Sequence, residues 1–271
     1  MRCMTMIALL ALAMCQVGFA QGVTGRVVSL DYCADQFVLK LLPRGSILAV
    51  SPDAGSHFSY MRDVAEGLRR VRPVAEDVLI LAPGLVVRSY GGGPRVVGFL
   101  EKAGIEVLQV PVVNDMDSIR EALLRIAEGL GVPGRGREIA AEMDRRLSRI
   151  RPSAGTRTAL YMTPTGVTSG PGTLVHEMLR AAGYSNFEGQ PGWRAIPLER
   201  LAYDTPDVVA AAFFNAGAHR PAMWSSMRHP VAKRQMSERP SVLLQGAWTS
   251  CGSWFLLDAV EALASAKMAE E

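Results

Sequence analysis

The sequence predicts an α/β protein of two lobes, each with a mostly parallel sheet, joined by one long α-helix. Short apolar segments of strand length alternate with helical patterns in both halves of the chain, as in βαβ units. The stretch between residues 117 and 155 instead has helical periodicity. The predicted divisions are therefore an N-terminal lobe at 21–116, a helical linker at 117–155 and a C-terminal lobe at 156–271.

The composition fits a folded protein of this size. The 271 residues are 49% hydrophobic and 20% charged, which allows a sizeable core and excludes global disorder. A formal net charge of +3 is too small to indicate a nucleic-acid partner.

The N-terminal lobe alternates strands with helices. Asp31 follows the first strand and opens a helical pattern, and Pro94 fits the first turn of a helix that Gly104 ends. The expected elements are a strand at 26–30, a helix to about 42, a strand at 47–50, an apolar segment at 78–81, a strand at 85–88, a helix from 94 and a strand at 105–110.

The linker and the C-terminal lobe follow. An amphipathic helix begins at Ser118, glycines at 131–136 interrupt it, and residues 135–151 form one long exposed helix. The elements expected next are a strand at 158–162, a loop to 172, a helix at 173–183, a loop through 193, a short helix at 198–203, a strand at 208–214, an irregular stretch at 215–230, a strand at 241–245 and a last helix at 253–267.

Residues 1–20 have the pattern of a cleavable secretory signal. Arg2 is their only charge, an apolar run follows, and small residues at Gly18 and Ala20 predict cleavage after Ala20. The apolar run is shorter than the roughly 20 residues of a spanning helix, so a membrane anchor is the weaker alternative. A lipoprotein signal that uses Cys15 is another alternative.

Removal of this signal leaves two of the four cysteines, Cys33 and Cys251. In an oxidising compartment an even pair is a possible disulfide. Both residues could lie at the mouth between the lobes, where a bond would restrain opening, so two free thiols remain the alternative. The chain has no Cys-x-x-Cys spacing typical of a metal site.

The two halves of the chain also repeat a signature. Glu76 precedes Pro83 by seven residues, Glu199 precedes Pro206 by seven residues, and a buried strand follows each proline. The segments FLEKAG and MLRAAG form a second matching pair. Chance is an alternative, because short helix–turn–strand units often share such residues, but the repetition favours pseudo-symmetric lobes.

Six segments together resemble the periplasmic substrate-binding proteins of iron-siderophore and cobalamin ABC importers, the helical-backbone class III type. They are RVVSLDYCADQFVL, EDVLILAPGLVVRSYGGG, FLEKAGIEVLQV, TSGPGTLVHEMLRAAGYSN, WRAIPLERLAYDTPDVV and WTSCGSWFLLDAVEAL, within residues 26–263. The resemblance implies two Rossmann-like lobes bridged by a rigid helix, with the ligand in the cleft between them and a small closure on binding.

The resemblance also implies partners. A periplasmic monomer would capture a metal chelate, namely a ferric siderophore, a cobalamin or a haem-like ligand, and deliver it to an inner-membrane ABC permease dimer with its ATPase. In this class one exposed acid per lobe pairs with permease arginines, and Glu76 and Glu199 occupy matching positions. Alternatively, each carboxylate only stabilises the N-terminus of its short helix.

Two departures from the class leave the ligand open. The stretch at 215–230 is longer and more irregular than expected for the class. Ser89, beside Tyr90, stands at a position where the resemblance to some cobalamin binders implies a tryptophan platform.

Candidate ligand-binding residues come from loops beyond the carboxyl ends of the strands, where open α/β sheets bind their ligands. A large planar or macrocyclic ligand needs flat apolar walls and a few polar anchors. We expect walls from Tyr32, Tyr90, Trp193 and Trp248 and anchors from Arg88 and Arg194, with Tyr32, Arg88 and Tyr90 on one lobe facing the other three. Ordinary packing of the aromatics and solvated arginines are the alternatives.

The chain carries no strong signal of an enzyme, and we predict no catalytic residue, cofactor or metal site. It has neither a phosphate-binding loop nor a Gly-x-Ser-x-Gly elbow. His57, His176, His219 and His229 lack metal-ligand spacing, although His219 and His229 flank the irregular stretch and could contact a metal or haem. The alternatives are a secreted α/β hydrolase or metal-chelating enzyme using the same cleft, and a structural periplasmic interaction module.

Overall fold

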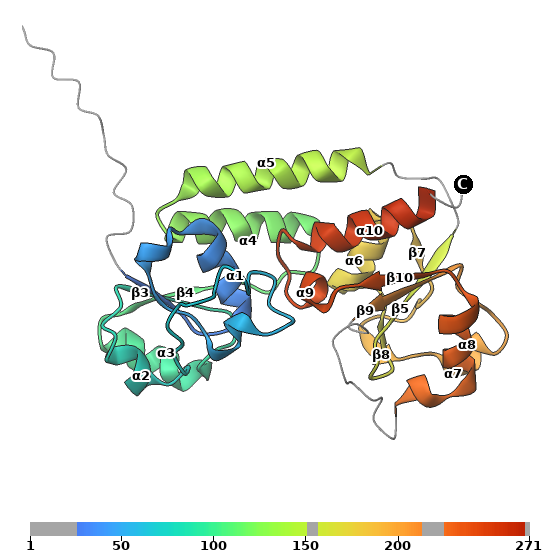
Figure 1. Ribbon diagram of the computed structural model, residues 1–271, viewed down its shortest axis with the longest axis horizontal. Coiled ribbons are helices and arrows are strands. Elements are labelled where there is room, and N and C mark those ends of the chain that lie inside the picture. Colours follow the sequence, from blue (N-terminus) through green and yellow to red (C-terminus); the bar gives the residue numbers. More distant parts are fainter. Residues whose placement is uncertain (1–25, 151–156, 213–224, 269–271) are drawn as a thin grey trace, which may run out of the picture.

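The computed structural model describes residues 26–150, 157–212 and 225–268, and it has two α/β lobes (Figure 1). The N-terminal sheet is parallel, in the order β2-β1-β3-β4, with β1 (Val27–Ser29), β2 (Ile47–Ala49), β3 (Leu85–Arg88) and β4 (Glu106–Gln109). The C-terminal sheet is parallel, in the order β10-β9-β5-β7, with β5 (Thr158–Met162), β7 (Ser185–Asn186), β9 (Val208–Ala212) and β10 (Ser241–Leu244). The predicted fold class is confirmed.

Helices cover both faces of the N-terminal sheet. They are α1 (Tyr32–Leu41), α2 (Ala75–Leu79) and α3 (Gly93–Lys102), with 3-10 turns at Arg44–Ser46 and Pro52–Gly55. Because successive side chains of a strand point to opposite faces, Val27 packs in the cluster that contains α1, whereas Val28 packs in the cluster that contains α2 and α3. Both faces of the strands are therefore apolar, as the short hydrophobic runs in the sequence indicate.

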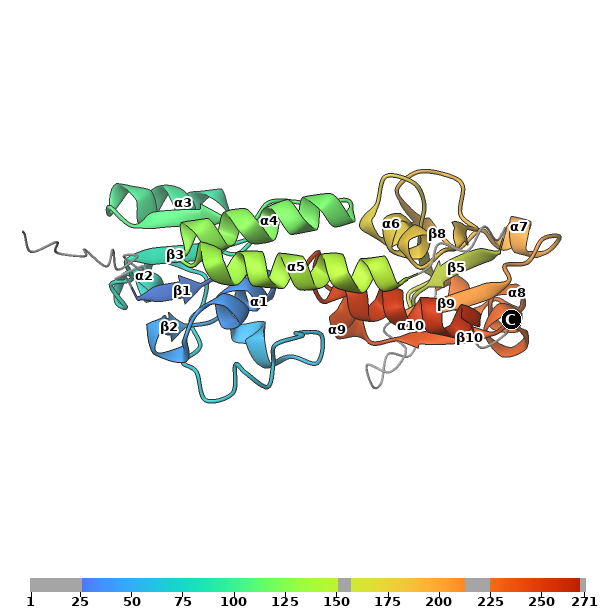
Figure 2. The same ribbon diagram turned by 90° about the horizontal axis from the view of Figure 1, so that it is seen from above.

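Two helices connect the lobes, α4 (Met116–Gly129) and α5 (Pro133–Arg149). Figure 2 shows them side by side, with α5 extending from the N-terminal lobe to the C-terminal lobe. Asp115 caps α4 through a reciprocal capping box with Ser118. The expectation of an exposed long helix needs correction, because α5 buries Ile139 and Met143 along one face. Only its opposite face is charged and solvated.

The C-terminal lobe contains α6 (Leu174–Ala181), α7 (Leu198–Leu201), α8 (Pro230–Glu238), α9 (Gly246–Thr249) and α10 (Leu256–Met268), with a 3-10 turn at Ser226–Arg228. Sequence analysis expected plain loops around 167 and 193, but β6 (Val167–Ser169) and β8 (Trp193–Ala195) pair there as an antiparallel ribbon. Residues 213–224 of the irregular stretch lie outside the described residues. No helix in the described segments is long and apolar enough to cross a membrane.

One hydrophobic core runs through both lobes. It includes Phe37 on α1, Ile126 on α4, Met143 on α5, Tyr161 on β5 and Phe255 just before α10, all nearly or fully buried. Smaller clusters lie on the other face of each sheet. Because the interior is continuous, the lobes cannot separate without exposing apolar surface to water.

Side chains from both lobes meet in what we call the interlobe seam, formed by Cys33, Tyr60, Cys251, Phe255 and Asp258. The rings of Tyr60 and Phe255 stack with centroids 4.4 Å apart, and the Tyr60 hydroxyl donates to Asp258 at 2.7 Å. A disulfide joins Cys33 in the first turn of α1 to Cys251 before α10. The structure therefore has the bonded form of the cysteine pair, and the bond crosses between the lobes.

Arg146 extends the interlobe seam to the connecting helix. Its guanidinium on α5 contacts Asp258 at 2.6 Å and Glu261 at 2.7 Å on α10. These carboxylates raise the pKa of Arg146, and Arg146 in turn lowers the pKa of Glu261. The same α10 residues thus bind both the N-terminal lobe and α5.

We predict that the variant Cys33→Ser/Cys251→Ser has a free energy of unfolding lower by about 2–5 kcal/mol, because a disulfide restricts the unfolded chain. Urea unfolding with and without a dithiol reductant measures the effect. The wild type should unfold at lower urea when reduced, and the double variant should be insensitive to the reductant. An unchanged wild-type midpoint would show that the bond contributes nothing to stability.

Candidate functional site

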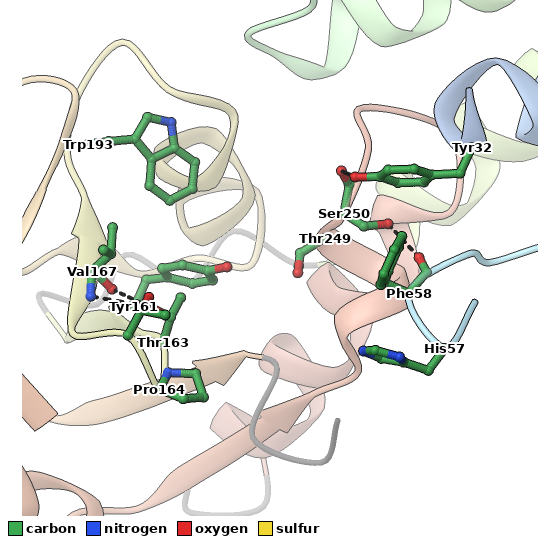
Figure 3. Close-up of a pocket in the computed structure, with 11 residues that line it drawn as sticks. Tyr32, His57, Phe58, Tyr161, Thr163, Pro164, Val167, Trp193, Thr249 and Ser250 are labelled. Carbon is green, nitrogen blue, oxygen red and sulfur yellow. Dashed lines mark hydrogen bonds between the residues drawn. The ribbon is translucent and has the colours of Figure 1, made fainter. Parts of the chain in front are cut away.

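A pocket of about 690 Å³ lies between the lobes (Figure 3). Its walls come from segments far apart in the sequence, and they include the loop beyond β5, where ligands of open α/β sheets bind. The lining residues are Tyr32, His57 and Phe58 from the N-terminal lobe and Tyr161, Thr163, Pro164, Thr165, Val167, Trp193, Thr249 and Ser250 from the C-terminal lobe.

Asp31 organises the N-terminal wall. One carboxylate oxygen accepts the amide of Ala34 at 2.9 Å and caps α1. The other accepts the amides of Ser89, Tyr90 and Gly91 at 2.6, 3.0 and 2.9 Å. A single buried carboxylate therefore holds the loop beyond β3 against the start of α1.

The Gly91 position requires glycine, because a Cβ there would lie 2.4 Å from the carbonyl oxygen of Leu30. The triglycine segment 91–93 is thus a tight turn, and the Gly91 amide donates to Asp31.

This arrangement brings Tyr32 and Tyr90 together, with ring centroids 6.0 Å apart. Burial raises the pKa of both phenols, while a hydrogen bond from Tyr90 acts in the opposite direction on the pKa of Tyr32. The Tyr32 hydroxyl donates to the carbonyl of Ser250 at 3.4 Å, across the lobes. Phe58 packs edge-on against Tyr32 at 4.8 Å and completes an aromatic wall.

The opposite wall is built on β5 and the β6–β8 ribbon. Tyr161, near the end of β5, is 1% exposed, and burial raises the pKa of its phenol to about 12. Trp193 on β8 is 60% exposed and meets Tyr161 edge-on at 6.2 Å. A Cβ at Gly170 would lie 1.8 Å from the Gln190 carbonyl oxygen, so the ribbon closes only with glycine there.

The structure brings Tyr32 and Trp193 to the same pocket, from opposite lobes (Figure 3). Tyr90 is next to Tyr32 but does not line the pocket. The other three sequence-predicted ligand residues lie elsewhere, so the expected set of six facing residues is not assembled.

Each of these three has a local reason for its position. Arg88 donates to the Gly91 carbonyl at 2.8 Å and to the Gln109 side chain at 2.7 Å. Arg194 lines a separate 420 Å³ pocket, because neighbouring residues of a strand point to opposite faces and Trp193 takes the inner one. Trp248 packs against the hydrophobic core, and the next two residues reach the pocket instead.

Sequence reasoning identified the loops that line the pocket but not most of the individual residues. His57, Phe58, Thr163 and Thr249 lie in loops expected beyond strand ends. Tyr161 sits within a predicted strand, and only its place near the carboxyl end could have indicated a pocket role. Among the described residues, no group of three His, Cys, Asp or Glu could hold a metal ion.

The remaining predicted positions are distributed over both lobes. Glu76 and Glu199 are exposed in the first turns of α2 and α7. His176 contacts the Asn186 amide at 3.3 Å, and His229 caps α8. His219 lies outside the described residues.

We predict that Asp31→Asn lowers the free energy of unfolding by about 1–3 kcal/mol, because an amide cannot accept all four backbone N–H groups. Urea unfolding and near-ultraviolet circular dichroism of the tyrosines would detect the loss. Asp115→Asn is the matched control. The Asp115 carboxylate caps an exposed helix end by accepting the backbone N–H of Ser118, a single bond that an amide oxygen can also accept. Equal stability of Asp31→Asn and wild type would contradict the role of Asp31.

Comparison with solved structures supports the fold. The apo form of the periplasmic heme-binding protein RhuT from Roseiflexus sp. RS-1 has 20% identity and a TM-score of 0.68, covering 89% of this chain and 98% of that one. HutB, a periplasmic heme-binding protein of Vibrio cholerae, has 16% identity and a TM-score of 0.68, covering 91% and 99%.

The periplasmic vitamin B12-binding protein BtuF of Vibrio cholerae has 19% identity and a TM-score of 0.66, covering 91% and 98% of the two chains. Comparison with curated proteins finds no match. The family model described as "Periplasmic binding protein" matches residues 27–213. Since this match spans more than half of the sequence, the chain belongs to the periplasmic binding protein family.

Proposed function

We propose that this protein is the substrate-binding component of an ABC importer and that it captures a planar iron chelate of the haem class. The observation that carries the proposal is the interlobe pocket, in which Tyr32 and Trp193 supply aromatic surfaces from opposite lobes. A volume of about 690 Å³ suits a ligand of substantial size. Similarity to solved heme-binding proteins supports the same ligand class.

Tyr32 is the residue we propose as the iron donor. Phenolate oxygen is an established axial ligand of haem iron. The Tyr90 hydrogen bond to Tyr32 favours the phenolate of Tyr32 over that of Tyr90. Flat apolar surfaces around the phenol would contact the face of the macrocycle.

The proposed role is binding without turnover. The chelate would be released chemically unchanged, in contrast to the product of a hydrolase or a metal-inserting enzyme. We further propose export through residues 1–20, with cleavage after Ala20, and action as a monomer in the periplasm.

We predict that hemin binds with an affinity that rises with pH. Burial raises the pKa of Tyr32, so the phenol is protonated at neutral pH and must lose its proton to bind ferric iron. Below that pKa the affinity should rise by up to about tenfold per pH unit. Absorbance titration and quenching of tryptophan fluorescence across a pH series measure this dependence.

Tyr32→Phe should weaken hemin binding and abolish the pH dependence. Tyr203→Phe is the matched control, because Tyr203 is 94% exposed and does not line the pocket. If the protein bound cyanocobalamin or a ferric hydroxamate tightly and did not bind hemin, the proposed ligand class would be wrong, and the ligand would be a cobalamin or a ferric siderophore. Binding of none of the three would contradict the proposed function.

Delivery to the permease is proposed to use Glu76 and Glu199. Figure 1 shows α2 and α7 at the edges of the two lobes that face away from α4 and α5. Both carboxylates are exposed, and neither has an ion pair among those found in the described part of the chain. The rigid interlobe seam would keep their separation fixed, so that they could engage both halves of a permease dimer.

We predict that Glu76→Arg/Glu199→Arg abolishes uptake in cells while leaving hemin affinity in solution unchanged, because exposed charges mainly govern association and register. Growth on hemin as the iron source and titration of purified protein measure the two effects. Glu121→Arg/Glu128→Arg on α4 is the control with equal charge change. Full uptake by the first variant would disprove the docking role, and loss of hemin affinity would assign these residues to the fold or the site.

A further inference from the structure

We propose that the hydroxyls of Tyr161 and Thr249 form a polar subsite that binds an edge carboxylate of the planar chelate. This inference rests on the proposed function and adds how the ligand would be oriented within the pocket. The two residues come from different elements, the end of β5 and the end of α9.

The geometry places both hydroxyls at the pocket. Figure 3 shows the Tyr161 side chain pointing across the pocket toward Thr249. The Tyr161 ring is fixed, since the residue is 1% exposed and packs against Trp193. The hydroxyl oxygen of Thr249 is buried, and apart from the adjacent Tyr161 phenol, whose pKa it lowers, it has no hydrogen-bond partner among the described residues. A buried hydroxyl whose hydrogen-bonding capacity is not fully used costs free energy, which a ligand that bonds to it would recover.

Other hydroxyls of the pocket already have partners. Thr163 contacts the Thr165 hydroxyl at 2.9 Å and accepts the amide of Val167 at 3.1 Å. Ser250 donates to the Phe58 carbonyl at 2.8 Å. The available hydrogen-bonding capacity of these hydroxyl-bearing residues is therefore concentrated at Tyr161 and Thr249.

The chemistry of this pair favours an acceptor on the ligand. Burial raises the pKa of Tyr161 to about 12, so the phenol keeps its proton at neutral pH and can donate it in a hydrogen bond. Two hydroxyl donors suit a carboxylate, and hydrogen bonds to an ionised acceptor are stronger than those between neutral groups. No Arg or Lys is among the described residues that line the pocket, so the carboxylate would be recognised by neutral donors.

The test compares hemin with hemin dimethyl ester, which keeps the ring and the iron but lacks the edge carboxylates. Tyr161→Phe should weaken hemin binding by about tenfold and change the affinity for the ester by less than about twofold. Thr249→Val should behave in the same way, and Thr249→Ser, which keeps the hydroxyl, should bind hemin like the wild type. The absorbance spectrum of bound hemin should be unchanged, because the iron ligand is untouched.

Other outcomes would overturn the inference. Equal loss for hemin and the ester would show that Tyr161 acts through pocket shape, and wild-type affinity of both Tyr161→Phe and Thr249→Val would show that the hydroxyls do not contact the ligand. In both cases hemin binding by the wild type would leave the proposed function standing. If the wild type binds neither compound, the proposed function fails and the subsite fails with it. Circular dichroism melting of each variant confirms that it is folded.

Discussion

The attachment of α10 to the N-terminal lobe is the constraint on which the rest of the structure depends. Tyr60 stacks on Phe255 and donates to Asp258, Arg146 holds the same helix from α5, and a disulfide closes the contact. Individually, a partly exposed ion pair or one aromatic contact contributes little to stability. Together with the continuous core they fix the relative position of the lobes, and the pocket forms where the two lobes are held face to face.

Within that frame the two walls are positioned by different means. Asp31 gathers four backbone amides and thereby sets Tyr32 beside Tyr90, so the N-terminal wall depends on one buried carboxylate. The C-terminal wall depends on backbone pairing, since the β6–β8 ribbon presents Trp193 over Tyr161. Contacts within the protein hold both walls in place, which would reduce the conformational cost of binding the proposed planar ligand.

The sequence predicted the fold class and most of the strands and helices, but only part of the candidate site. The apolar runs of the strands and the helix-starting residues such as Asp31 are patterns of residues close together in the sequence, and such patterns predict strands and helices well. Which side of a strand faces a pocket depends on pairing, so the unexpected ribbon placed Trp193 in the pocket and Arg194 on another face. The roles of Arg88 and Trp248 could not be predicted either, because they depend on tertiary contacts. Arg88 bonds to the turn at Gly91, and Trp248 packs against the core. Tyr161 was missed because a buried strand residue and a pocket residue have the same sequence pattern.

The cysteine pair also has a consequence for how the molecule is made. Cys33 precedes Cys251 by 218 residues, so its partner emerges only when nearly the whole polypeptide has been synthesised. Until Cys251 is available, Cys33 keeps a free thiol, and a free thiol can enter thiol–disulfide exchange with other proteins. Once α10 is in place, the thiol is consumed. The bond therefore distinguishes completed molecules from truncated or misassembled ones, because the latter retain a free Cys33 thiol.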